Sequence, residues 1–157
     1  MALRTFLRNM AIALCLLPAG CSENEAPQST EEIIRQHHNS PLSDSIDAVV
    51  QTLAKRPVFV GTEGVTPTEN GVATGELRLK TAADSQGNLW AYAYTSREEF
   101  SQAFPEGGAY AELAFADLFS IIEPNPQFAG IYLNSASDSS YPIPREIFER
   151  VKKNLKE

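Results

Sequence analysis

The chain has 157 residues, 43% hydrophobic and 21% charged, an ordinary composition for a globular protein with one hydrophobic core. Residues 1–20 hold two arginines and no acid, so the rest of the chain carries 11 basic and 20 acidic residues, a net charge of −9. This charge repels nucleic acid and gives no general attraction to anionic lipids, which excludes a nucleic-acid-binding protein.

The first twenty residues have the order of a secretory signal. Arg4 and Arg8 precede the apolar stretch Met10–Leu17, which is too short to span a bilayer comfortably. The run Leu17–Cys21 (LPAGC) resembles the lipobox of bacterial lipoproteins, although a proline stands where the motif usually has an aliphatic residue. The alternative is an ordinary cleaved signal followed by a chance cysteine.

The lipobox resemblance implies a destination. In that class the signal is cut before the cysteine and the cysteine is acylated, so Cys21 would attach the protein to a membrane, facing the periplasm. Ser22 at the next position resembles sorting to the outer rather than the inner membrane. Several acyl chains give firm anchoring, because a single chain binds only marginally.

Residues able to form metal or nucleophilic sites are scarce. No cysteine follows Cys21, and the two histidines, His37 and His38, are adjacent in the sequence. Thiol catalysis, Ser-His-Asp catalysis and cysteine-based metal sites are therefore not expected in the folded part. The sequence predicts no metal, no cofactor and no assembled catalytic set.

Residues 21–39 are polar and acidic, and they are predicted to form a tether between the lipid and a domain at 40–157. Within this segment Ser29 and Glu32 have the spacing of a capping box, which allows a short helix through Ile34.

The first half of the domain begins with a helix. Ser40-Pro41 is typical of a helix start, and an apolar stripe runs from there to Leu53. A buried strand is predicted at 58–60, a Gly-, Thr- and Pro-rich loop at 62–74, and an alternating strand at 76–80.

The second half alternates short strands and helices. Strands are predicted at 89–94, 110–113, 130–134 and 141–143, and helices at 96–103, 116–122 and from Pro144 onward. Ser96 and Glu99 form a second capping box, and Pro142 restricts the last strand to a sheet edge. This order predicts a single α+β domain with a mixed, largely antiparallel sheet and flanking helices.

From Ile46 to Val151 the parts resemble the N-terminal domain of the SseB family. The segments that carry the resemblance are Gly87-Asn88-Leu89, Ala93-Tyr94-Thr95-Ser96, Gly108-Ala109-Tyr110, Ala116-Asp117-Leu118, Gly130-Ile131-Tyr132-Leu133-Asn134 and Pro144-Arg145-Glu146-Ile147. The family usually continues Asn-Pro-Gly after the last strand, whereas Ser135 follows here. The resemblance implies an α+β fold but no established activity or catalytic residue, and most family members are cytoplasmic.

Aromatic residues give one candidate binding surface. Trp90, Tyr92 and Tyr94 share one face of a strand, and Tyr132 lies on another strand. If no helix covers that face, these side chains form an amphipathic surface; otherwise they pack in the core.

A second group of candidates lies at strand ends. Thr95, Ser96 and Asn134 could orient a ligand, but Ser96 also suits a helix cap and Asn134 suits a left-handed turn. The leading hypothesis is a lipid-anchored, non-enzymatic envelope protein that binds a protein partner or ligand. The alternative is a small envelope enzyme that uses carboxylates and hydroxyls around these three residues.

Overall fold

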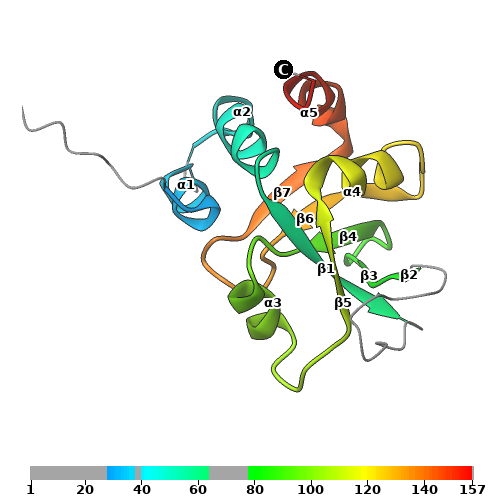
Figure 1. Ribbon diagram of the computed structural model, residues 1–157. Coiled ribbons are helices and arrows are strands. Elements are labelled where there is room, and N and C mark those ends of the chain that lie inside the picture. The colour runs from blue at the N-terminus through cyan, green and yellow to red at the C-terminus, as the bar shows by residue number, and fades with distance from the viewer. Residues whose placement is uncertain (1–27, 38–39, 64–77, 157) are drawn as a thin grey trace, which may run out of the picture.

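The computed structural model describes residues 28–37, 40–63 and 78–156 (Figure 1). The predicted signal, the lipobox with Cys21 and most of the predicted loop at 62–74 lie outside the described residues.

The described chain alternates helices and short strands. In order these are α1 (Thr30–His37), α2 (Leu42–Leu53), β1 (Pro57–Glu63), β2 (Arg78–Leu79), β3 (Thr81–Ala83), β4 (Leu89–Ala93), α3 (Arg97–Ala103), β5 (Tyr110–Ala114), α4 (Phe115–Ile122), β6 (Phe128–Leu133), β7 (Tyr141–Pro144), a 3-10 turn (Arg145–Ile147) and α5 (Phe148–Asn154).

The strands form two small sheets. One has the order β2-β1-β5 and the other β3-β4-β6-β7, and all pairs are antiparallel except β4 with β6. Phe59 of β1 and Tyr94, just after β4, exchange two backbone hydrogen bonds of 2.8 Å, which join the sheets. The predicted α+β class with a mixed, largely antiparallel arrangement is confirmed, and the proline-bearing β7 lies at an edge as expected.

The main core lies between the helices and one face of the strands. In Figure 1, α2, α4 and α5 lie together above the strands, while α3 lies apart below β1. The core comprises apolar side chains of α2, α4 and α5 packed on alternate residues of the strands; its strand members include Val58, Val60, Ala91, Ala93, Ile131, Leu133 and Ile143. Because side chains alternate between the two faces of a strand, the remaining side chains of β4 and β6 point away from this core.

A second, smaller cluster is aromatic. Phe59 and Tyr94 are buried together with Phe100 of α3, and Phe104 packs beside them. Ser96 caps α3 by accepting a hydrogen bond from the backbone N–H of Glu99 at 3.2 Å, as its capping-box spacing predicts. Helix α2 begins at the predicted Ser40-Pro41 pair, with Pro41 as its N-cap residue.

The C-terminal part of the segment predicted as a tether, 21–39, forms the helix α1. Ser29 accepts a hydrogen bond from the backbone N–H of Glu32 at 3.1 Å and begins α1. Ile34 of this helix has no exposed surface and belongs to the main core. The described fold therefore includes α1, which starts about ten residues before the predicted domain boundary at 40, because the apolar side of α1 packs in the core.

Candidate functional site

One face of the four-stranded sheet carries an aromatic surface, which we call the outer face. Strand pairing places Trp90 beside Gly130 and Tyr92 beside Tyr132, with Ala82 on β3 next to Trp90. On β7, Pro142 and Pro144 lie beside Tyr132 and Gly130 on the same face. Trp90 and Tyr132 belong to neither core cluster of the described residues, and both are partly exposed.

The three rings of the outer face form a continuous ridge. Tyr92 and Tyr132 stack with ring centroids 5.8 Å apart, and Trp90 meets Tyr132 edge-on at 5.9 Å. These separations are those of favourable aromatic pairs. The ridge is therefore an ordered apolar surface with polar tips.

Trp90 is fixed in place by its neighbours. Its indole N–H donates to Asp84 Oδ2 at 3.2 Å, and its ring lies over Gly130, where an added Cβ would come within 2.6 Å of the indole. Hydrogen bonds from Asn88 and Trp90 lower the pKa of the exposed Asp84 carboxyl to about 2. The carboxylate therefore remains an acceptor for the indole across the ordinary pH range.

Hollows border the ridge, and each is lined by one of its three rings. One of about 410 Å³ lies between Trp90, Pro144 and Arg145. Another of about 270 Å³ separates Tyr132 and Pro142 from Leu42 at the start of α2.

The third hollow, which we call the Tyr92 hollow, has a volume of about 370 Å³. Its lining includes Glu63, Lys80, Tyr92, Tyr94, Phe104 and Ser135. The Lys80 ammonium lies 4.9 Å from the centre of the Phe104 ring, a cation–π contact.

Of the two alternatives for Tyr94, an exposed surface or packing in the core, the structure shows packing in the core. Its ring is only 3% exposed and packs edge-on against Phe100 at 5.5 Å and Phe104 at 5.8 Å. The backbone bridge to Phe59 draws it under α3. Its hydroxyl still reaches the Tyr92 hollow, where it lies 3.4 Å from Ser135 Oγ. Burial raises the pKa of this phenol, so the hydroxyl stays protonated.

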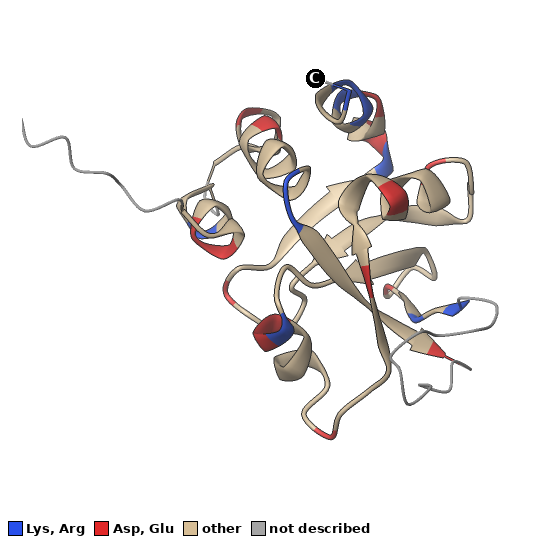
Figure 2. Cartoon of the chain, in the orientation of Figure 1, with Lys and Arg blue, Asp and Glu red and all other residues tan. Residues whose placement is uncertain are grey.

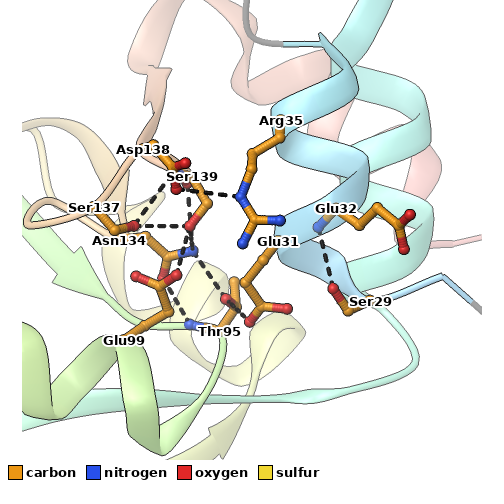
Figure 3. Close-up of polar contacts among 10 residues, drawn as sticks. All are labelled: Ser29, Glu31, Glu32, Arg35, Thr95, Glu99, Asn134, Ser137, Asp138 and Ser139. Atoms are coloured by element: carbon orange, nitrogen blue, oxygen red, sulfur yellow. Dashed lines mark hydrogen bonds and ion pairs between the residues drawn. The ribbon is translucent and has the colours of Figure 1, made fainter.

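Thr95 and Asn134 meet in a buried polar network (Figure 3). Asn134 Oδ1 accepts the backbone N–H of Thr95 at 2.9 Å, and Asn134 Nδ2 donates to Thr95 Oγ1 at 2.9 Å. The same amide donates to Ser139 Oγ at 3.1 Å, and Ser139 donates to Glu99 Oε1 at 2.6 Å. Asn134 and Ser139 have no exposed surface, and Asn134 adopts a left-handed φ of 49°. The predicted turn at Asn134 is confirmed.

Helix α1 covers this network from the solvent side. The Thr95 hydroxyl donates to Glu31, and Arg35 pairs with Asp138 at 3.2 Å, both drawn in Figure 3. Burial alone would raise the pKa of Glu31, but hydrogen bonds from Thr95, the backbone and Ser29, together with the charge of Arg56, hold it below its usual value. The network thus connects α1 to the ends of β4 and β6.

The structure therefore separates the predicted site residues into two groups. Trp90 and Tyr92 lie on the outer face, whereas Thr95, Ser96 and Asn134 serve a network and a helix cap. Lys80 and Phe104 were missed. Lys80 has the same signal as any exposed lysine in an alternating strand, and Phe104 resembles an ordinary apolar residue at the end of α3.

The described residues contain no group of three metal-ligating side chains, and none of their helices is long and apolar enough to cross a bilayer.

The fold and this arrangement define a small α+β domain with one helix-covered sheet face and one aromatic face. The family model of the SseB protein N-terminal domain matches residues 31–149, and the chain belongs to this family. The match begins within α1, in agreement with the docked position of that helix. Searches of curated proteins and of solved structures gave no match.

Proposed function

We propose that the chain is an exported lipoprotein, anchored through Cys21 in the outer membrane and facing the periplasm. Its SseB domain binds a protein partner of the cell envelope through the outer face and catalyses no reaction. The observation that carries the proposal is the ridge of Trp90, Tyr92 and Tyr132 on the sheet face opposite the main core.

The composition of the outer face suits a protein partner. Trp and Tyr are enriched at the centres of interfaces, where they supply large contact area and keep a polar tip for hydrogen bonding. Here the three rings are already held by one another, by Asp84 and by the sheet, so little conformational freedom is lost on binding.

The position of α1 constrains the anchored protein. Residues 22–28 separate Cys21 from Ser29, the cap of α1, and a chain of this length spans less than about 30 Å when fully extended. The domain would therefore be held close to the membrane by its α1 end. This proximity favours a partner that is itself at the membrane.

The contacts around Thr95 and Asn134 favour binding over catalysis. An enzyme using these residues would need their polar atoms to line a hollow beside a carboxyl group of raised pKa. Instead, Asn134 is fully buried, Ser96 caps α3, and the pKa of Glu31 is lowered.

The test is in-cell crosslinking of the full-length protein, followed by mass spectrometry. A dominant envelope partner should be recovered with the unmodified chain and with Ile121→Ser, and its recovery should fall about tenfold with Tyr132→Ser. Ile121 is the matched control because it is a large apolar residue, 45% exposed, on α4 rather than on the outer face.

The same spectra report the mass of the Cys21 peptide. Acylation at Cys21, and release of Cys21→Ser from the membrane fraction, are the expected results for the anchor. Equal recovery of the partner with Tyr132→Ser would contradict the binding surface, and a Cys21 peptide without lipid would contradict the anchor.

A further inference from the structure

The Tyr92 hollow offers a ligand more than a flat contact. Its volume of about 370 Å³ lies within the range of small-molecule pockets. It opens beside the ridge, because Tyr92 belongs both to its lining and to the stacked pair with Tyr132. A group that inserts here would adjoin anything bound to the outer face.

The walls of the hollow are aromatic and rigid. Phe104 packs on Phe100 with ring centroids 4.6 Å apart and meets Tyr94 edge-on at 5.8 Å. Tyr92 is held on the other side by its stack with Tyr132. An apolar group placed between Tyr92 and Phe104 would bury its surface against rings that need no rearrangement.

The hollow also contains one cation. Lys80 is held over the Phe104 ring and forms no ion pair with the described residues. The acidic residue of the lining, Glu63, lies directly opposite Arg78 in the β1–β2 ladder, so a basic residue faces it there. Figure 2 shows the basic residues of β2 and the β2–β3 junction beside the acidic end of β1. The Lys80 ammonium can therefore attract an anionic group that enters the hollow.

Two hydroxyls complete the polar side. Tyr94 Oη and Ser135 Oγ lie 3.4 Å apart at the hollow. Hydroxyls donate to carboxylate oxygens, and an ammonium adds a charge-assisted bond.

We propose that the Tyr92 hollow binds an apolar carboxylate, with the acid on Lys80 and the apolar body between Tyr92 and Phe104. The carboxylate is that of a free acid or of the C-terminal residue of a peptide. The inference rests on the proposed binding function and specifies the chemistry recognised beside the ridge.

The test measures dissociation constants of two matched pairs by calorimetry, with the full chain in detergent. The first pair is 3-phenylpropionate and its amide, and the second is a short peptide ending in phenylalanine, with a free or an amidated C-terminus. For at least one pair the acid should bind about tenfold or more tightly than the amide, the difference expected for one charge-assisted contact. The pair that shows it identifies the source of the carboxylate.

Lys80→Met keeps the apolar stem of the side chain and removes its charge, so acid and amide should then bind equally. Lys153→Met, on α5, is the matched control and should keep the preference. Thermal unfolding checks that both variants fold.

Equal binding of acid and amide to the unmodified chain, no binding of either pair, or a preference that survives Lys80→Met would overturn the proposal. The crosslinking experiment tests the proposed partner separately: a partner whose recovery depends on Tyr132 would support the proposed function even if neither acid bound. Conversely, binding of the free acid without any Tyr132-dependent partner would contradict only the proposed partner.

Discussion

Asn134 is the residue on which the end of β6 depends. Its φ of 49° is unfavourable for most side chains, but asparagine tolerates it. Its amide also has both a donor and an acceptor, so one side chain serves the backbone of Thr95, the Thr95 hydroxyl and Ser139. A glycine would allow the turn but could make none of these bonds.

Replacing Asn134 should separate these two contributions. Asn134→Gly removes the whole side chain but leaves a residue that adopts the left-handed φ without strain, and it should lower the free energy of unfolding by about 2–3 kcal/mol, because buried partners lose their hydrogen bonds. Asn134→Ala should cost about 1 kcal/mol more, since it adds the left-handed strain. Urea unfolding of the three proteins measures both differences. A glycine variant as stable as the unmodified protein would show that the network contributes nothing.

Gly130 is required by the close approach of β7 and Trp90. An added Cβ would lie 2.4 Å from the Ile143 carbonyl oxygen and 2.6 Å from the indole. Gly130→Ala should therefore cost about 2–3 kcal/mol and displace Trp90, with a shift in its fluorescence. Gly108→Ala is the control, because its nearest neighbour would be at an ordinary 3.5 Å. An unchanged emission spectrum in Gly130→Ala would contradict the placement of the indole.

The Asp84–Trp90 contact gives a pH prediction. Because the folded-state pKa of Asp84 is lowered to about 2 from 3.8, the stabilisation is complete above the unfolded value and is lost as pH falls through about 2. Fluorescence of Trp90, the single tryptophan of the chain, should stay constant from neutral pH to about 3 and change as the pH falls through about 2. Asp84→Asn should lack this component. A transition near neutral pH that Asp84→Asn abolishes would contradict the assignment.

Among the helices and strands, α1 shows that a local sequence pattern can predict a helix but not whether that helix packs on the domain. The Ser29 cap was readable from the capping box, but an eight-residue helix is marginal alone. Whether it docks depends on a space in the core for Ile34, and that space is built by distant elements. The polar composition of this segment, with only two isoleucines, therefore predicts a tether rather than a packed helix.

Truncation tests the docking of α1. A chain that begins at residue 40, the predicted boundary, should be less stable than one that begins at residue 28 by about 2–4 kcal/mol, because it leaves the Ile34 site empty. Within the longer chain, Ile34→Ala should reproduce much of this loss, whereas Glu32→Ala, on the exposed side, should not. Denaturant midpoints provide the comparison, and equal midpoints for the two chains would mean that α1 does not contribute to the fold.

At the scale of the whole molecule, the class and the order of elements could be predicted because helical and alternating patterns are local. The position of the outer face could not be predicted, because β4 carries Trp90 and Tyr92 on one face and Ala91 and Ala93 on the other, and the sequence alone does not say which face the helices cover. The structure places the helices on the alanine side, at Ala91 and Ala93. The split of Tyr94 from Trp90 and Tyr92 likewise depends on the long-range bridge to Phe59.

Photo-crosslinking in the cell tests whether this protein binds its partner through the outer face. A photoreactive phenylalanine analogue would replace Tyr132 in one strain and Ile121, on the helix side, in another. The proposal predicts one dominant crosslinked partner from position 132 and little or none from position 121. No crosslinked partner at position 132, or equal yields from both positions, would contradict it.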